Sequence, residues 1–212
     1  MRTPFIVGSV LCAGLFFTAA ANAQEGRFSA HVGGGFTEPV DVTGDRLDRG
    51  YNISAGAGVN VIPQLGLNAE FLFVNNGVSR GTLDSLGYPD GDMRIYAFTL
   101  NPVIRFTREE SPVAVYITGG GGIYHRNIEF TQPTVTSFTA FDPFFGVFYP
   151  VAVPADQVIN SFSTTKGGIN GGGGISFRLG NSRTKFFAEA RYHHMFTRQP
   201  TTIVPVTFGL RW

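Results

Sequence analysis

The sequence predicts an all-β fold, an eight-stranded antiparallel up-and-down transmembrane β-barrel. Three observations predict it: apolar residues alternate with small or polar ones, the alternating segments are about as long as a bilayer is thick, and short and long connections alternate. A period of two sends successive side chains to opposite faces of a strand, so each segment has one apolar face. A strand that crosses a membrane needs about 9–11 residues.

Eight segments carry this alternation. In YNISAGAGVNV, for example, Tyr51, Ile53 and Val59 share one face, whereas Asn52 and Ser54 fall on the other. The segments run over 27–36, 51–61, 65–74, 93–106, 113–124, 166–179, 185–196 and 203–212. The connections IPQ, TREESP and GNSR are short, those at 37–50, 75–92 and 125–165 are long, and the last, 197–202, is short for its class. Short turns on one side and long loops on the other are typical of bacterial outer-membrane barrels.

A soluble β-sandwich or a lipocalin-like barrel is the structural alternative, because alternation alone does not separate these folds from a membrane barrel. The non-apolar face here is mostly glycine, serine and asparagine with isolated charges. Such a face suits a narrow eight-stranded barrel, whose lumen is filled by side chains. The sequence therefore favours the membrane barrel.

Two runs of four glycines, 119–122 and 171–174, lie inside strand segments. Neither run continues as the Gly-Lys-Ser/Thr of a phosphate loop, and neither matches the dinucleotide pattern G-x-G-x-x-G. We expect the lumen-facing glycines to leave room for arginine and tyrosine side chains from neighbouring strands.

Residues 1–23 read as a signal peptide, and residues 24–212 as the barrel domain. Arg2 precedes a short apolar stretch, and ANA at 21–23 supplies small residues for cleavage before Gln24. The single cysteine, Cys12, lies in this segment, so disulfides are not expected in the mature chain. The net charge of +1 gives no basic face for nucleic acid.

Isolated charges on the small-residue face predict a charge network in the lumen. We expect Glu70, Glu189 and Arg191 to point inward near mid-depth, and Arg105, Arg178 and Arg211 to point inward nearer the periplasmic end. Because an unpaired buried charge costs several kcal/mol, these groups should pair, with Glu189 facing Arg211. The predicted lumen is a packed plug with little or no conductance.

The segment FTAFDPFFGVFYPVAVP is unusually apolar for a surface connection. Its aromatic residues are Phe138, Phe141, Phe144, Phe145, Phe148 and Tyr149. Its prolines, Pro143, Pro150 and Pro154, disfavour a continuous central strand, so we predict a loop. The loop either covers the barrel mouth and the outer leaflet, or contacts a hydrophobic ligand, lipopolysaccharide or another cell surface.

The whole mature chain resembles the OmpA/OmpX-like outer-membrane β-barrel family. VTFGLRW is similar to the C-terminal signature of that family, and it supplies Phe208, Gly209, Leu210 and Trp212 as a candidate assembly signal. The resemblance implies an outer-membrane location in a Gram-negative bacterium and export through the general secretory pathway. It also implies contact with outer-membrane lipid, lipopolysaccharide, periplasmic chaperones and the barrel-assembly machinery. OmpA itself has a peptidoglycan-binding domain, and none is expected here.

Catalysis is not expected. His193 and His194 point to opposite faces, so they cannot share one metal ion, and no cofactor is predicted. Lipid A deacylases carry His-x-Ser and a glutamate on the next strand, whereas Met195 and Phe196 follow His194 and the last strand has no acid. We therefore predict a monomeric protein with a structural or surface-interaction role. A narrow channel for small hydrophobic molecules is the alternative, and a lipid A-modifying enzyme is a weaker one.

Overall fold

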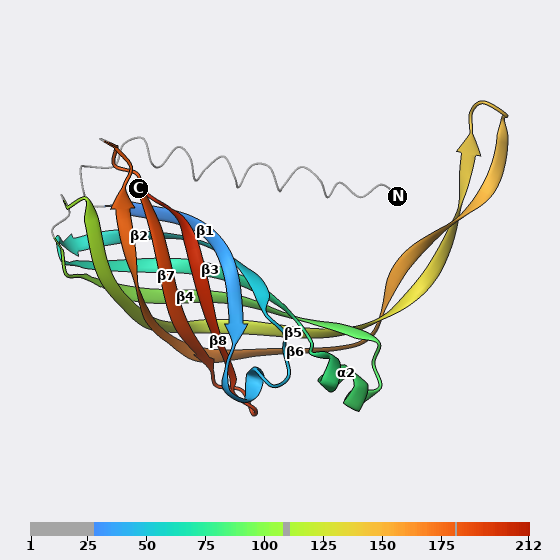
Figure 1. The fold of residues 1–212 in the computed structure, drawn as a ribbon, viewed down its shortest axis with the longest axis horizontal. Coiled ribbons are helices and arrows are strands. Elements are labelled where there is room, and N and C mark those ends of the chain that lie inside the picture. The colour runs from blue at the N-terminus through green and yellow to red at the C-terminus, as the bar shows by residue number, and fades with distance from the viewer. Residues whose placement is uncertain (1–27, 108–110, 181) are drawn as a thin grey trace, which may run out of the picture.

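The structure, a computed structural model, describes residues 28–107, 111–180 and 182–212. Its eight strands form one closed antiparallel barrel in which neighbours in sequence are neighbours in space and the first strand pairs with the last (Figure 1). The predicted fold class is therefore confirmed. The signal peptide predicted at 1–23 lies outside the described residues.

The strands follow the predicted segments closely except in the third long connection. They are β1 (Phe28–Pro39), β2 (Gly50–Ile62), β3 (Leu65–Gly77), β4 (Asp90–Arg105), β5 (Val113–Asp142), β6 (Val147–Arg178), β7 (Lys185–Met195) and β8 (Thr201–Arg211). A short 3-10 helix, η2 (Asp41–Thr43), follows β1, and α2 (Arg80–Leu86) follows β3. Both lie at the barrel end opposite the C-terminus (Figure 1). Among the described residues, every helix is too short or too polar to cross a bilayer.

The outer wall is apolar and is bordered by aromatic residues. At the long-loop end, rings on successive strands approach one another: Tyr51 and Phe73 have centroids 6.0 Å apart, Phe73 and Tyr96 5.2 Å, and Tyr96 and His125 6.3 Å. Phe28, Phe106 and Trp212 are exposed at the other end. Aromatic girdles of this kind mark the two membrane interfaces of outer-membrane barrels.

The two glycine runs lie on the paired strands β5 and β6 and meet at one pair, Gly119 opposite Gly171. Inward-facing glycines lie directly against large side chains. A Cβ on Gly174 would come within 2.7 Å of the Tyr116 hydroxyl, and one on Gly172 within 2.8 Å of Arg191 Cγ. The glycine wall thus leaves the space that the rings and the arginine fill.

Toward the long-loop end the inward face is apolar, which differs from the small and polar face that the sequence pattern suggested. The buried cluster there is formed by Leu47, Leu72, Val74, Val78, Leu83, Met93, Ile95, Ala97, Tyr124, Phe130, Met195 and Ile203. Leu83 of α2 belongs to it, so the helix covers this end of the lumen. The barrel interior consequently has a hydrophobic layer at the extracellular end and polar layers below it.

The long connection at 125–165 is not a loop, and this prediction was wrong. β5 and β6 continue as a two-stranded ribbon beyond the barrel and turn only at 143–146 (Figure 1). Proline is excluded from central strands because it cannot donate to a ladder. Beyond Thr131 on β5 and before Gly168 on β6, however, each strand has only one partner, so both are edge strands and tolerate proline.

The ribbon is anchored where it leaves the barrel. The register shifts between Phe130 and Thr131, as expected for a β-bulge that redirects the strands. The Phe130 ring stacks on Tyr88 with centroids 4.2 Å apart, and Asn160 Nδ2 donates to the Tyr88 hydroxyl at 2.8 Å. The base of the ribbon is therefore part of the barrel core, whereas its outer part is not.

This division predicts the result of shortening the ribbon. Replacing 132–157 by Asn-Gly, a favoured two-residue hairpin turn, should leave a barrel that still changes its gel mobility on heating. Replacing 130–160 in the same way also removes Phe130 and Asn160, and should lower the temperature of that change. Loss of the heat-dependent shift in the 132–157 replacement would contradict this prediction.

Candidate functional site

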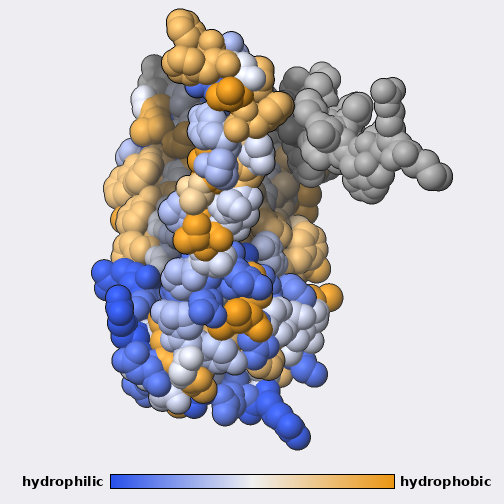
Figure 2. Space-filling model, turned by 90° about the vertical axis from the view of Figure 1, so that its right-hand side faces the viewer, coloured by the Kyte–Doolittle hydropathy of each residue, from blue (hydrophilic) through white to orange (hydrophobic). Residues whose placement is uncertain are grey.

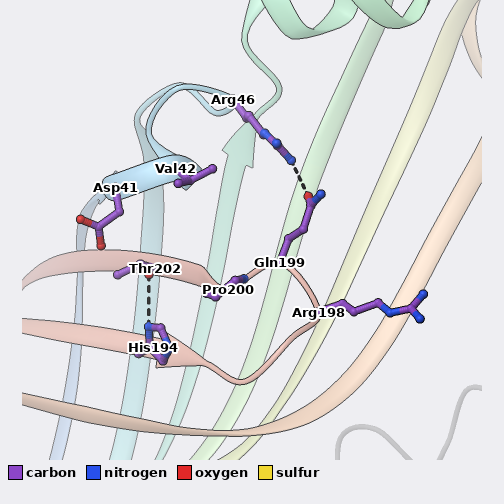
Figure 3. Close-up of a pocket in the computed structure, with 8 residues that line it drawn as sticks. All are labelled: Asp41, Val42, Arg46, His194, Arg198, Gln199, Pro200 and Thr202. Carbon is purple, nitrogen blue, oxygen red and sulfur yellow. Dashed lines mark hydrogen bonds between the residues drawn. The ribbon is translucent and has the colours of Figure 1, made fainter.

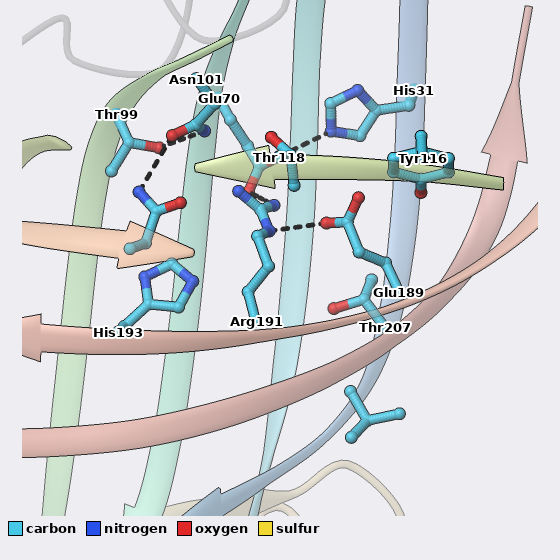
Figure 4. A network of polar contacts seen from close by, with 12 residues as sticks. His31, Glu70, Thr99, Asn101, Tyr116, Thr118, Glu189, Arg191, His193 and Thr207 are labelled. Carbon is cyan, nitrogen blue, oxygen red and sulfur yellow. Dashed lines mark hydrogen bonds and ion pairs between the residues drawn. The ribbon is translucent and has the colours of Figure 1, made fainter. Parts of the chain in front are cut away.

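The centre of the lumen is occupied by Arg191 on β7. Its Nε lies 2.6 Å from Glu189 Oε1, and its Nη2 contacts Glu70 Oε1 on β3 (Figure 4). The side chains of all three residues are buried. A single guanidinium is thus shared by two carboxylates, so the buried positive charge has two negative partners.

Two further groups extend this chain across the barrel. His31 Nε2 lies 3.0 Å from the second oxygen of Glu70, and Arg211 Nη2 lies 3.8 Å from the second oxygen of Glu189. The Arg211 guanidinium also covers the rings of Tyr116 and Phe187, at 4.7 and 5.1 Å from their centroids. The network therefore runs from β1 through β3, β7 and β8.

The other predicted lumen charges lie closer to the periplasmic end. Arg105 Nη2 donates to Asn60 Oδ1 at 2.8 Å, and Arg178 is inward-facing and half-buried near the end of β6. His31 was not among the predicted residues. The sequence did contain a signal that His31 faces the lumen. It alternates in step with Gly33 and Gly35, which lie on the inward face of β1.

Polar side chains fill the cross-section on the extracellular side of this network. The Tyr124 hydroxyl lies 3.0 Å from His193 Nδ1, and the side-chain amides of Asn170 and Asn101 contact each other at 2.9 Å. These contacts join side chains of the barrel itself. Because eight strands enclose just enough space for their own side chains, these residues fill the lumen with contacts among themselves.

The aromatic residues of the ribbon form a second candidate site. Phe144 and Phe145 at the turn are 91% and 75% exposed, and Phe141 and Phe148 pair across the strands with centroids 4.9 Å apart. Phe138 and Tyr149 also remain exposed. Figure 2 shows hydrophobic residues gathered at the outer end of the ribbon, at the top of the view, and hydrophilic residues at the loop end of the barrel below.

The candidate assembly signal lies at the end of β8 and includes Trp212, the residue after the strand. Phe208, Leu210 and Trp212 are exposed on the outer wall, whereas Gly209 faces inward against Phe187. The backbone of Trp212 exchanges two hydrogen bonds with Ala30, of 2.9 and 3.0 Å, at the seam where β8 meets β1. The terminal aromatic thus lies beside the strand pair that closes the barrel.

A third group of polar residues lies outside the barrel, near the extracellular ends of β1 and β7. His194 Nδ1 is 3.4 Å from the Thr202 hydroxyl, and Asp41 lines the same cavity. A hydroxyl, an imidazole and a carboxylate are the groups of a nucleophilic triad. However, Thr202 is only 2% exposed, and the Asp41 carboxylate accepts a hydrogen bond from Tyr192 rather than from His194. The arrangement does not present a nucleophile to a substrate.

No group of three or more metal-ligating side chains occurs within the described ranges.

Removing a glutamate should destabilise the barrel more in the lumen than on the outer surface. Glu70→Ala or Glu189→Ala leaves a buried arginine short of a partner and should destabilise the barrel by about 3–5 kcal/mol. Glu129→Ala breaks the half-exposed pair with Arg94 and should cost less than about 1 kcal/mol. Denaturant unfolding in detergent micelles measures the difference. Equal effects of the inner and outer substitutions would contradict the assignment.

Comparison with known proteins agrees with this architecture. Residues 9–210 match the family described as outer membrane protein beta-barrel domain. No curated protein sequence matches the chain. Among solved structures, Neisserial surface protein A superposes with a TM-score of 0.55 at 14% identity, covering 87% of this chain and 95% of that one.

Two other outer-membrane proteins superpose similarly. A major outer membrane protein from Thermus thermophilus gives a TM-score of 0.53 at 12% identity, covering 88% of this chain and 98% of that one. OprG from Pseudomonas aeruginosa gives 0.50 at 12% identity, covering 88% and 96%. The family match spans nearly the whole chain and implies an outer-membrane location. The chain belongs to the outer membrane protein beta-barrel domain family.

Proposed function

We propose that the protein is a non-catalytic outer-membrane barrel that makes surface contacts through the aromatic tip of the β5–β6 ribbon. The observation that carries this proposal is the exposure of Phe144 and Phe145 at the end of a long ribbon that projects from the barrel (Figure 1). Large exposed apolar patches mark sites that interact with proteins, ligands or membranes.

The length of the ribbon supports the proposal that its tip contacts a surface other than the membrane that holds the barrel. Twelve residues separate the bulge at Thr131 from the end of β5 at Asp142, inclusive. At about 3.3 Å per residue, the tip reaches about 40 Å beyond the barrel. Rings held at that distance are positioned to meet an opposing surface.

The prolines of the ribbon argue against a partner that adds a strand. In the β5–β6 ladder the proline pairs are Pro133 with Asp156, Val135 with Pro154 and Thr139 with Pro150. Successive pairs in this series are two and then four residues apart, so all three have the same hydrogen-bonding orientation. In an antiparallel ladder, alternate pairs direct their N–H groups toward the partner or outward. Because proline has no N–H, an unbroken ladder places it where the N–H would point outward. Both outer edges of the ribbon therefore lack donors at these positions, which disfavours pairing with a further strand. The tip and the faces of the ribbon, rather than its edges, are left for contact.

The charge of the ribbon favours an electrically neutral lipid surface. Between residues 131 and 158 the only charged side chains are Asp142 and Asp156, and the segment has no lysine or arginine. A membrane-binding tip for acidic lipids would carry cations, since each basic residue near an anionic surface contributes about 1 kcal/mol. We therefore propose insertion of the tip into the apolar region of a neutral bilayer.

The alternative, a narrow channel for small hydrophobic molecules, is favoured by the apolar layer at the extracellular end of the lumen. The charged layer around Arg191 blocks the same path, so we rank transport second. We further propose that the barrel is monomeric within outer-membrane lipid and lipopolysaccharide. Export through the general secretory pathway and assembly by periplasmic chaperones and the barrel-assembly machinery complete the proposal.

Vesicle binding tests the surface-contact role. Protein held in nanodiscs should bind phosphatidylcholine vesicles, and Phe144→Ser/Phe145→Ser should weaken binding at least about tenfold, because burying one phenylalanine contributes about 1.5–3 kcal/mol. Val135→Ser is the matched control, since Val135 is 70% exposed on the stem of the ribbon, and it should change binding less than about twofold.

Equal binding by the wild type and the tip variant would contradict the proposal. A concentration-dependent dimer that the tip variant abolishes would assign the tip to a second copy of the chain instead of to lipid.

A further inference from the structure

A cavity of about 400 Å³ lies on the outside of the barrel, between the connection that follows β1 and the one that joins β7 to β8. The first connection supplies Asp41, Val42 and Arg46, and the second supplies Arg198, Gln199 and Pro200 (Figure 3). His194 of β7 and Thr202 of β8 complete the lining. The cavity belongs neither to the lumen network nor to the aromatic tip.

The walls of this cavity are fixed by hydrogen bonds between the two connections. The Val40 N–H donates to the Thr202 carbonyl at 3.2 Å, and the Thr202 N–H donates to Thr43 Oγ1 at 3.0 Å. Across the opening, Arg46 Nη1 donates to Gln199 Oε1 at 2.5 Å. The cavity is therefore a preformed feature of the folded chain.

The backbone at Asp41 supports a built site. Its φ of 55° lies in the left-handed region, where non-glycine residues are uncommon and where strain accompanies functional constraint. This conformation lets Asp41 Oδ2 accept a hydrogen bond from the Tyr192 hydroxyl at 3.0 Å. In Figure 3 the Asp41 carboxylate and the Arg46 guanidinium point away from one another, and the guanidinium is turned toward Gln199.

The cavity lies at the level of the outer membrane interface. Tyr192 is exposed on the lipid-facing side of β7, three residues before the strand ends at Met195. The His194 ring is stacked parallel to Tyr192 with centroids 6.5 Å apart, and the Phe196 ring lies 5.6 Å from His194. This aromatic column leads from the lipid-facing wall to the cavity, which His194 lines. Exposed aromatic rings at this level are typical of a membrane interface.

The chemistry of the lining matches an amphiphile with a phosphorylated head. The exposed arginines Arg46 and Arg198 supply planar donors of the kind that bind phosphate oxygens. The aromatic column offers an apolar surface to the chains that continue into the bilayer. We propose that this cavity binds the phosphorylated headgroup of an outer-leaflet lipid.

Lipid A, which carries phosphate groups, is the probe for this site, with dephosphorylated lipid A and inorganic phosphate as comparison ligands. Binding is measured by titration of the folded, detergent-solubilised protein. Arg46→Gln/Arg198→Gln should bind lipid A at least about tenfold more weakly, because hydrogen bonds to charged groups are the stronger class. Arg46→Lys/Arg198→Lys keeps both charges but loses the planar donors, and should recover part of the affinity.

Arg49→Gln is the matched control, since Arg49 lies on the same connection but pairs with Glu38 at 2.6 Å and does not line the cavity. It should bind lipid A as the wild type does. Each variant is first shown to keep the heat-dependent gel shift, so loss of binding reports the site and not the fold.

The wild type should bind dephosphorylated lipid A as weakly as the double glutamine variant binds lipid A. Millimolar inorganic phosphate should not displace lipid A from the wild type. Unchanged affinity in the double glutamine variant, or equal loss in Arg49→Gln, would overturn the proposal. Displacement by inorganic phosphate alone would assign the cavity to a soluble phosphate and would overturn its assignment to a lipid.

Discussion

Arg191 lies between Glu70 and Glu189 in a narrow lumen that the side chains of eight strands fill, where a buried charge without a partner is costly. Other features of the interior follow from accommodating this guanidinium and its partners. Gly172 lies against the Arg191 stem, and Gly174 against the Tyr116 ring that Arg211 covers. The glycine runs in β5 and β6 are thus the space-making counterpart of the charged and aromatic side chains on neighbouring strands.

A filled interior leaves the outside of the barrel and its extracellular end as the places where other molecules can bind. The two surfaces that stand out there have different chemistry. The ribbon tip is aromatic and nearly uncharged, whereas the cavity beside η2 combines exposed arginines with an aromatic column. Both lie at the same end of the barrel, the cavity beside η2 and the tip at the outer end of the ribbon.

Much of this arrangement could be predicted from the sequence, because a strand with one apolar face reveals itself in a period of two. The same period placed Glu70, Glu189 and Arg191 on one face. It could not show that His31 and Glu70 meet, since that contact spans 39 residues and depends on barrel closure. The ribbon was missed because the proline rule applies to strands with two neighbours, and the number of neighbours is a property of the folded sheet. The cavity beside η2 was missed because its lining comes from two connections without periodicity.

Recording ion current through the purified protein in a planar lipid bilayer tests the central claim most directly. If paired charges and packed side chains close the lumen, the wild-type protein should be electrically silent or nearly so. Steady, large single-channel conductance from the wild type would show that the lumen is open. That result would contradict the plug and would favour the transport role over the surface role.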